Sequence, residues 1–435
     1  MKINIIIIIF LILSIILNIT NYNLFLLLLS IIWYIASTLI IYSGIKYSIK
    51  YKFIQLNIKK IINAIKSKSN NSISPISSLC ISLAAKIGVG SLSGIALAIY
   101  FGGIGTIFWI CIISLIIAIN TYIECQLGIK YRENNNNYYF GGPSYYIKKC
   151  LNNKPLSYLY SIILIITYSI LFLSIQTNTI INTTKFLNIN TQYTIIILFI
   201  ITLLIIIKGL KRISTINTII VPIMLIFYLI LGIYTTITNI TLLPNIFINI
   251  IKEAFNLKSI ISVFLIGMQR AIFITESSLG TSAISASTCD NSPSKQGLLE
   301  VFGTYITIFV VCLTTFIIIT TSDYQAINYK LINGIDLVLY AFKYHFGHSG
   351  TIFLSIITIL FAFSTIISSY YFGESNLNFI SKRKISKLIF KIIFLLIIII
   401  SSYIKSFFLW NLTDYFIALL AIINIYSIIK IKDNE

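Results

Sequence analysis

The stretch AAKIGVGSLSG, residues 84–94, interrupts a run that is otherwise apolar enough to cross a membrane. It places a lysine and three glycines, Gly88, Gly90 and Gly94, in the middle of residues 76–100. Each glycine costs about 1 kcal/mol relative to alanine in a helix interior. Three of them together favour a break in the helix. A broken backbone at membrane depth is tolerated only where protein covers it or where it lines a cavity.

A second apolar run, residues 259–285, contains a polar island from Thr275 to Ser282 that includes Glu276. The two interruptions fall in the first and the sixth predicted spans after a basic segment at 46–68. Paired interruptions of this kind are typical of transporters built from two inverted repeats, in which the binding site forms where the breaks meet. Helix N-termini at a break suit a carboxylate, and freed carbonyls suit an ammonium group or a cation. For glycines alone, close helix packing through small residues is the structural alternative.

The composition is that of a protein with many membrane spans. Of 435 residues, 57% are hydrophobic and 10% are charged, whereas about 25% are charged in a soluble domain. The formal net charge is +20, but no basic stripe with interleaved aromatic residues is present, so we expect no nucleic-acid partner. The cysteines form no CxxC pair, and His345 and His348 fall in an expected loop. The sequence therefore argues against an enzyme and offers no site for a resident cofactor.

Eleven windows satisfy the requirement of about 20 mostly apolar residues for a spanning helix. They are residues 23–45, 76–100, 104–130, 157–181, 188–207, 213–238, 259–285, 298–320, 351–373, 388–404 and 408–429. Residues 3–20 form a further apolar run, either a short extra span or an uncleaved signal-like start. We expect it to be retained, because no A-x-A-like cleavage site follows it.

Loops rich in lysine and arginine alternate along the chain with loops that are poor in them, as orientation in a bilayer requires. Segment 46–68 contains seven lysines and no acidic residue, which places it in the cytoplasm. We therefore expect a multi-pass protein of the cell (cytoplasmic or inner) membrane, surrounded by lipid, with its basic loops inside. Of the longer external connections, residues 243–256 predict a short interfacial helix. For residues 321–350 a solvated loop is favoured over interfacial helices.

Several motifs resemble, in order, the signature of the alanine/glycine:cation symporter family. The first runs from Ser74 to Trp109 and contains the interrupted stretch, and the others are residues 131–147, 208–224, 270–280, 296–303 and 361–376. The resemblance implies an all-α polytopic membrane protein with a leucine-transporter-like fold. Ten core helices would form a 5+5 inverted repeat in which core helices 1 and 6 are broken, with one transmembrane helix before them. It also implies import of a small neutral amino acid coupled to sodium by alternating access.

This resemblance and the charge pattern together divide the chain into five parts. They are an N-terminal apolar segment (1–22), a transmembrane helix with a basic cytoplasmic segment (23–75), a first repeat (76–238), an external interfacial segment (239–258), and a second repeat with a short cytoplasmic tail (259–435). The sequence does not predict an oligomeric state.

The resemblance also assigns roles to residues of this sequence. Those implied to bind the substrate are Gly88, Gly90, Ser91, Gln176, Phe273, Thr275, Ser278 and Ser369. Sodium would be held by the hydroxyls of Ser364 and Thr365 together with backbone carbonyls near Ile87, since a hard cation prefers oxygen ligands.

The sequence departs from the family pattern at several of these positions. The family normally has asparagine at Ser91 and Thr275, glycine at Ser278 and a tryptophan at Ser369, so the pocket is expected to be roomier and more polar. The identity of the amino acid therefore stays open. The family also has threonine at Lys86.

Lys86 is the most consequential departure. A lysine at the centre of a bilayer costs about 2.5–3.5 kcal/mol on insertion scales and usually faces a cavity and pairs with another group. We expect its ammonium to lie near the cation site or to pair with Glu276, where it would replace a bound cation. Coupling to sodium, to a proton, or to no cation at all is compatible with this position. The structural alternative is a lysine that snorkels to the membrane surface.

Other charged residues are expected to hold helices or gates. Glu124 is expected to anchor the second core helix by pairing with Arg132 or Arg270. Arg270 is expected to form a gate pair with Glu276 or Asp290, or to donate to helix ends. A channel or uncoupled facilitator on the same fold is the competing function, and flux insensitive to sodium and protons would distinguish it.

Overall fold

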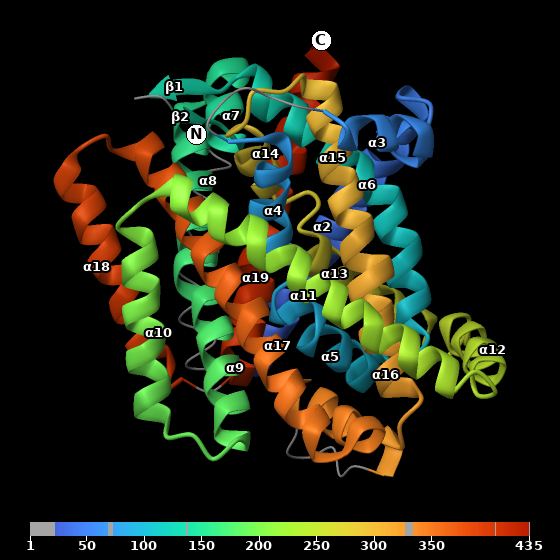
Figure 1. Ribbon diagram of the computed structural model, residues 1–435. Helices are drawn as coiled ribbons and strands as arrows, with labels where there is room; N and C mark the ends of the chain where they lie inside the picture. Colours follow the sequence, from blue (N-terminus) through green and yellow to red (C-terminus); the bar gives the residue numbers. More distant parts are fainter. Residues whose placement is uncertain (1–21, 68–72, 136–137, 327–333, 405, 435) are drawn as a thin grey trace.

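The computed structural model describes residues 22–67, 73–135, 138–326, 334–404 and 406–434, and these are almost entirely helical. The helices are gathered into one bundle (Figure 1). Within the described residues, seven spans are long and apolar enough to cross a membrane, so the protein is an all-α, multi-pass integral membrane protein. These spans are α2 (Tyr22–Lys50), α6 (Thr106–Lys130), α8 to α9 (Lys154–Phe186, with a π-helical turn at Thr167–Phe172), α11 (Leu210–Thr238), α15 to α16 (Pro293–Thr320, with a π-helical turn at Ile306–Cys312), α17 (Gly334–Ile380) and α19 (Ser406–Asn434).

A bent helix pair provides an eighth span in the described part of the chain. Its first half, α4 (Pro75–Lys86), begins where the Ser74 hydroxyl accepts a hydrogen bond from the Ser77 N–H and proline occupies the first turn, an arrangement favoured at helix N-termini. The second half is α5 (Ser93–Gly102).

The remaining helices are shorter. They are α3 (Ile58–Ile65), α7 (Pro143–Leu151), α10 (Thr191–Ile206), α12 (Leu243–Ala254), α13 (Ile260–Thr275), α14 (Thr281–Ala286), α18 (Lys384–Ser401) and the short 3₁₀ turns η1 (Ile54–Leu56), η2 (Val89–Ser91) and η5 (Tyr324–Ala326). Each of the eleven windows predicted from hydropathy falls on one helix or one helix pair of the structure. The apolar run at 3–20 lies outside the described residues.

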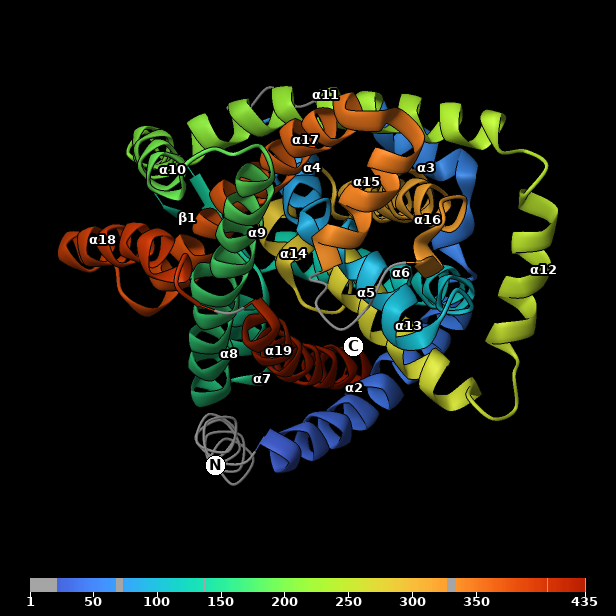
Figure 2. The same ribbon diagram turned by 90° about the horizontal axis from the view of Figure 1, so that it is seen from below.

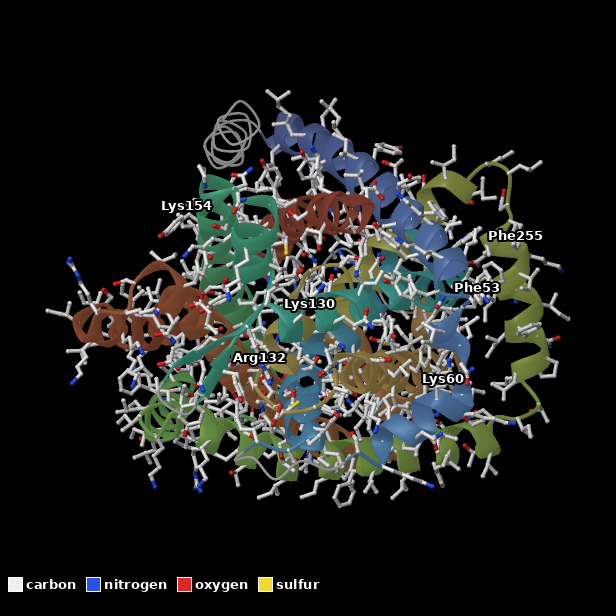
Figure 3. All side chains as sticks on the ribbon, turned by 90° about the horizontal axis from the view of Figure 1, so that it is seen from above. Phe53, Lys60, Lys130, Arg132, Lys154 and Phe255 are labelled. Atoms are coloured by element: carbon white, nitrogen blue, oxygen red, sulfur yellow. The ribbon has the colours of Figure 1, made fainter. Side chains whose placement is uncertain are left out.

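One end of the bundle carries the basic connecting segments. It includes α3, α7 and the two-stranded antiparallel hairpin of β1 (Glu133–Asn135) and β2 (Tyr138–Phe140), all at the top of Figure 1. The view from above in Figure 3 shows Lys60, Lys130 and Arg132 on this end. The hairpin was not predicted from the sequence, since strands of three residues leave almost no periodicity to detect.

The other long connections are helical. The short helix predicted at 243–256 is confirmed as α12, which lies at the periphery of the bundle in the view from below (Figure 2). The solvated loop predicted for 321–350 is wrong from Gly334 onward, because α17 begins there and turns sharply at Gly347 (φ 63°). A positive φ costs a glycine little. His345 therefore lies in a helix, with its Nε2 atom 3.0 Å from the Ile318 carbonyl oxygen.

Candidate functional site

The first broken span changes direction by 56° between α4 and α5. Regular helix ends at Lys86, residues 89–91 form the turn η2, and all residues from 84 to 94 are buried. Glycine is required here for space. A Cβ at Gly88 would lie 2.5 Å from Thr365 Oγ1, and a Cβ at Gly90 would lie 2.5 Å from Phe273 Cε1. Side chains of α13 and α17 thus contact the backbone of the break directly.

Backbone groups freed by this break are satisfied by three other side chains. The Val89 N–H donates to Gln176 Oε1 at 3.2 Å, and Gln176 comes from α9. The Ser91 hydroxyl donates to the Gly88 carbonyl oxygen at 2.8 Å. The Thr315 hydroxyl lies 3.0 Å from the Ser91 carbonyl oxygen. The structure therefore brings four predicted substrate residues, Gly88, Gly90, Ser91 and Gln176, to one place.

The second broken span ends its first half, α13, at Thr275. Glu276 (φ 52°), Ser278 (φ 77°) and Gly280 (φ 87°) then adopt left-handed backbone conformations before α14 starts at Thr281. Left-handed conformations are uncommon for residues other than glycine and persist where the surroundings enforce them. The prediction that both apolar runs are interrupted is confirmed.

Three neighbouring helices hold this second break. The Asn424 amide of α19 donates to the Ser278 carbonyl oxygen at 2.9 Å, and the Tyr160 hydroxyl of α8 donates to the Leu279 carbonyl oxygen at 2.5 Å. From α6, the Asn120 amide donates to the Ser278 hydroxyl at 3.0 Å. The unwound backbone is thereby covered by protein, which is the condition for its existence at membrane depth.

The polar side chains of the second break mostly satisfy local backbone groups. The Thr275 hydroxyl donates to the Ala271 carbonyl oxygen at 2.7 Å and accepts from the Ser277 N–H at 3.2 Å. The Ser278 hydroxyl is also engaged, because it accepts the hydrogen bond from the Asn120 amide of α6. The Ser369 hydroxyl, on α17, is buried and has no hydrogen-bond partner among the residues that the structure describes.

Phe273 joins the two breaks. Its ring packs over Gly90, and it stacks on Phe172 of the π-helical turn with ring centroids 5.1 Å apart and planes 14° from parallel. Trp410 of α19 lies on it as well, with ring centroids 5.0 Å apart. Phe273 thus covers the first break at Gly90, and aromatic residues of two other spans pack on its ring.

The two hydroxyls predicted to hold sodium point to different neighbours. Thr365 Oγ1 lies 2.7 Å from the carbonyl oxygen of Ala84, in the last turn of α4, and donates to it. Ser364 Oγ donates within its own helix and lies 3.9 Å from the Met224 sulfur of α11. Of the pair, Thr365 is the one hydrogen-bonded to α4 in this structure.

Lys86 is buried and forms an ion pair with Glu300 of α15, with 3.6 Å between Nζ and Oε2. Its Nζ atom also lies 3.4 Å from the Thr304 hydroxyl. The predicted pairing of Lys86 with Glu276 is wrong, because Glu276 instead accepts a hydrogen bond from Thr281 at 2.8 Å. Glu300 is a charge partner that sequence reasoning missed, because its position within a recognised motif gave no sign of the pairing.

Arg270 of α13 pairs with Asp414 of α19, at 2.6 Å between Nη2 and Oδ2. The predicted gate partners Glu276 and Asp290 are therefore wrong. The Arg270 guanidinium also lies over the Trp410 ring, 5.5 Å from its centroid. Asp414 is the second charge partner that the sequence-based prediction did not name.

Glu124 also differs from its predicted role. Its carboxylate accepts a hydrogen bond from the Asn424 amide at 2.7 Å, so Glu124 connects α6 to α19 without an ion pair to Arg132 or Arg270. Arg132 pairs with Asp290 on the basic end of the bundle, at 3.1 Å.

The family described as sodium:alanine symporters matches residues 5–434. The chain belongs to the sodium:alanine symporter family. It is therefore related to transporters and not to enzymes.

Three relatives illustrate the range of this symporter family. A probable sodium/glutamine symporter (GlnT) of Bacillus subtilis is 33% identical over 399 residues, which cover 88% of this chain and 83% of the relative. An amino-acid carrier protein (AlsT) of the same organism is 29% identical, covering 91% of this chain and 87% of the relative. A sodium/alanine symporter (AgcS) of Methanococcus maripaludis is 28% identical, covering 84% and 83%.

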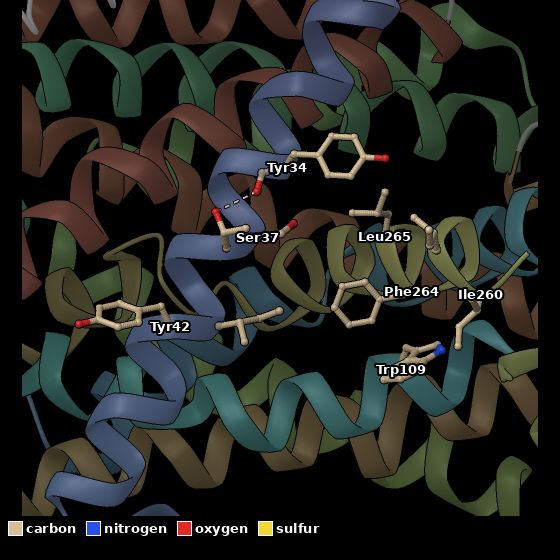
Figure 4. A pocket seen from close by; sticks show the side chains of 10 residues that line it. Tyr34, Ser37, Tyr42, Trp109, Ile260, Phe264 and Leu265 are labelled. Atoms are coloured by element: carbon tan, nitrogen blue, oxygen red, sulfur yellow. Dashed lines mark hydrogen bonds between the residues drawn. The ribbon is translucent and has the colours of Figure 1, made fainter. Parts of the chain in front are cut away.

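A cavity of about 640 Å³ lies elsewhere in this symporter, between α2, α6 and α13 (Figure 4). Tyr34 and Tyr42 of α2, Trp109 of α6, and Phe264 and Leu265 of α13 contribute to its largely apolar wall. It contains none of the residues of the two breaks. A zwitterionic substrate needs polar partners that this wall lacks, so the candidate substrate site is the region where the breaks meet.

Proposed function

We propose that this chain imports a small neutral amino acid together with sodium by alternating access. Its spans from 76–238 and 259–435 would form the two inverted halves of a leucine-transporter-like fold. The observation that carries the proposal is the contact between two interrupted spans, in which Phe273 of one packs on Gly90 of the other. Paired broken helices that meet inside the bilayer are how transporters of this architecture build a substrate site.

The substrate carboxylate would bind backbone N–H groups of the first break at Gly88 and Gly90, beside Ser91, whose own N–H donates to the Gly88 carbonyl oxygen at 3.1 Å. Short helical turns at such breaks point N–H groups and a partial positive charge at an anion. The substrate ammonium would bind carbonyl oxygens of the second break near Thr275 and Ser278, where the Ser278 carbonyl oxygen also accepts from Asn424. Gln176, which already accepts from the first break, would turn its amide toward the substrate.

Phe273 would cover the bound amino acid, and the Arg270–Asp414 pair would hold the Phe273 ring in place. Opening of this pair would release the ring and expose the pocket on the side away from the basic end of the bundle. The basic end would face the cytoplasm of a cell whose cytoplasmic membrane holds the protein, in keeping with the distribution of lysine and arginine between loops.

The cation would bind beside Thr365, whose hydroxyl already lies against the Ala84 carbonyl near Ile87. Rotation of the Ser364 side chain toward α4 would add a second hydroxyl oxygen, giving the oxygen-rich surroundings that sodium prefers. No other cofactor is required.

The test is counter-transport in proteoliposomes. The purified chain is reconstituted, loaded with unlabelled amino acid, and offered labelled alanine, glycine, serine or glutamine with sodium present or replaced by choline. Counter-transport of at least one amino acid that stops in choline supports the proposal. Alanine and glutamine are among the amino acids offered because relatives of this chain are named as symporters of one or the other.

Lys86 favours a second candidate function, an amino acid carrier in which the lysine replaces the bound cation and which is proton-coupled or uncoupled. Counter-transport that is equal in sodium and choline would favour this candidate. Flux without counter-transport would instead indicate a channel. Absence of any amino acid flux would contradict both transport proposals.

A further inference from the structure

The contact between α4 and α15 contains a charge pair that is fully buried. The side chains of Lys86 and Glu300 are each 0% exposed, and Nζ lies 3.6 Å from Oε2. This separation is too long for a hydrogen bond. The other neighbours of Nζ are the Glu300 carbonyl oxygen at 3.5 Å and the Thr304 hydroxyl at 3.4 Å, both at the limit of hydrogen bonding.

This pair keeps unused hydrogen-bonding capacity. Neither carboxylate oxygen of Glu300 has a hydrogen-bond partner among the described residues, and the same holds for the hydroxyl of Ser82, one turn before Lys86 on α4. A buried ion pair is stable only when further hydrogen bonds satisfy its remaining lone pairs. An unsatisfied carboxylate of this kind is suited to accept a proton, because the neutral acid is cheaper to bury than the anion.

Carboxylates outnumber ammonium groups around this pair. Glu124 of α6 and Glu276 of the second break lie close enough to Lys86 to interact with its charge. The thiols of Cys80, Cys125 and Cys289 lie close enough to Glu300 to interact with its charge. With Glu300 there are three carboxylates to one ammonium group, and full ionisation would leave two uncompensated negative charges inside the membrane. Such an excess favours binding of a proton or a metal cation.

Lys86 is also placed beside the candidate cation site. It occupies the same final turn of α4 as Ala84, whose carbonyl oxygen accepts from Thr365. While Glu300 is ionised, it compensates the lysine charge. When Glu300 is protonated, the negative charge paired with Lys86 is lost, and the ammonium group repels a nearby cation more strongly.

We propose that Glu300, paired with Lys86, is a proton-binding site that competes with the coupling cation. The inference rests on the proposed function, and in particular on a sodium site at Thr365. The proton comes from solvent and adds to a carboxylate oxygen of Glu300, while Lys86 keeps its three protons throughout. Proton binding lowers sodium affinity, and by thermodynamic reciprocity sodium binding releases the proton.

Transport measurements test the competition. The sodium concentration that gives half-maximal amino acid uptake into proteoliposomes is measured from mildly acidic to mildly alkaline pH, with an amino acid already shown to undergo counter-transport. We expect this concentration to rise as pH falls, with a limit of about tenfold per pH unit for competition between one proton and one sodium. Glu300→Gln, which imitates the protonated acid, is expected to need high sodium at every pH. The double variant K86M/E300Q removes both charges and is expected to need little sodium at every pH.

A matched control is the exposed pair of Lys46 and Asp433, whose atoms lie 2.7 Å apart. The double variant K46M/D433N is expected to keep the pH dependence of the wild type. A direct readout is proton release from the detergent-purified protein when sodium is added to a weakly buffered solution with a pH indicator. Release is expected from the wild type and not from Glu300→Gln.

The outcomes separate the two proposals. Amino acid uptake with a sodium requirement that is independent of pH overturns the proton site and leaves the proposed function standing. So does a Glu300→Gln variant with the same pH dependence or proton release as the wild type. Sodium-independent uptake overturns the competition as well. A wild-type chain that carries no amino acid under any of these conditions overturns the proposed function and the proton site with it.

Discussion

The guanidinium of Arg270 lies 2.6 Å from the carboxylate of Asp414, so a salt bridge ties the first half of the second broken span to α19. Both side chains are less than 10% exposed, and one nitrogen of Arg270 and one oxygen of Asp414 have no further hydrogen-bond partner among the described residues. The same guanidinium lies 5.6 Å from the centre of the Phe273 ring. The salt bridge therefore fixes the aromatic ring that covers the first break.

Removing one charge of this pair is expected to destabilise the protein. Asp414→Asn leaves the Arg270 charge buried without its partner, a change that costs about 3–5 kcal/mol for a buried ion pair. Asp290→Asn is the matched control, because Asp290 pairs with Arg132 at the surface with 56% of its side chain exposed, where pairs are worth about 0–1 kcal/mol. Thermal unfolding in detergent should show a clear loss for Asp414→Asn and little for Asp290→Asn. Equal losses of thermal stability in the two variants would mean that the buried Arg270–Asp414 pair contributes no more than the surface pair.

Two glycines of the first broken span, Gly90 and Gly94, offer a sharper test of the pocket. Gly90→Ala would place a Cβ 2.5 Å from the Phe273 ring, whereas nothing lies within 4 Å of a Cβ at Gly94. We expect Gly90→Ala to reduce amino acid counter-transport by about tenfold or more, because the Phe273 ring must move to make room for the methyl group; a tenfold loss corresponds to about 1.4 kcal/mol. Gly94→Ala should retain transport, and its helix should be favoured by about 1 kcal/mol. Similar activity of the two variants at equal expression would argue against a substrate beneath Phe273.

Gln176 supports the first break from a different helix. Gln176→Leu removes the acceptor of the Val89 N–H, and a buried donor left unpaired costs about 1–3 kcal/mol. We expect the apparent affinity for the amino acid to fall by about tenfold, measured as the concentration for half-maximal uptake. Asn182→Leu is the control on α9, because the Asn182 amide donates to Asn178 in the same helix. An unchanged affinity in Gln176→Leu would remove this residue from the proposed site.

How far the sequence predicts this structure depends on whether a feature is caused by residues close together in the sequence or by residues far apart in it. The breaks at 87–91 and 276–280 could be predicted because their causes are local: several glycines close together in one, and a polar island in the other. Helix positions follow from hydropathy for the same reason. The connection at 321–350 was predicted as a loop because its charged residues and histidines suggested solvent, although apolar residues such as Leu337, Val338 and Phe342 are buried along α17.

Charge partners could not be predicted, because they depend on which helices become neighbours. Lys86 and Glu300 are separated by 214 residues, and Arg270 and Asp414 by 144. The sequence identifies Lys86 as expensive to bury, so the existence of a partner is predictable while its identity is not. Side-chain direction cannot be predicted from the sequence either, since the adjacent residues Ser364 and Thr365 turn toward different helices.

That difference makes Thr365 the decisive residue for sodium. Thr365→Val keeps the shape of the side chain but removes the oxygen that lies against the Ala84 carbonyl. We expect the sodium concentration for half-maximal uptake to rise by about tenfold, which corresponds to about 1.4 kcal/mol of cation binding, while Thr365→Ser keeps most of the affinity. Thr358→Val is the matched control on α17, because the buried Thr358 hydroxyl has no hydrogen-bond partner among the described residues. If sodium dependence is the same in Thr365→Val and Thr358→Val, the cation binds elsewhere, and the oxygen ligands must be sought among the carboxylates near Lys86.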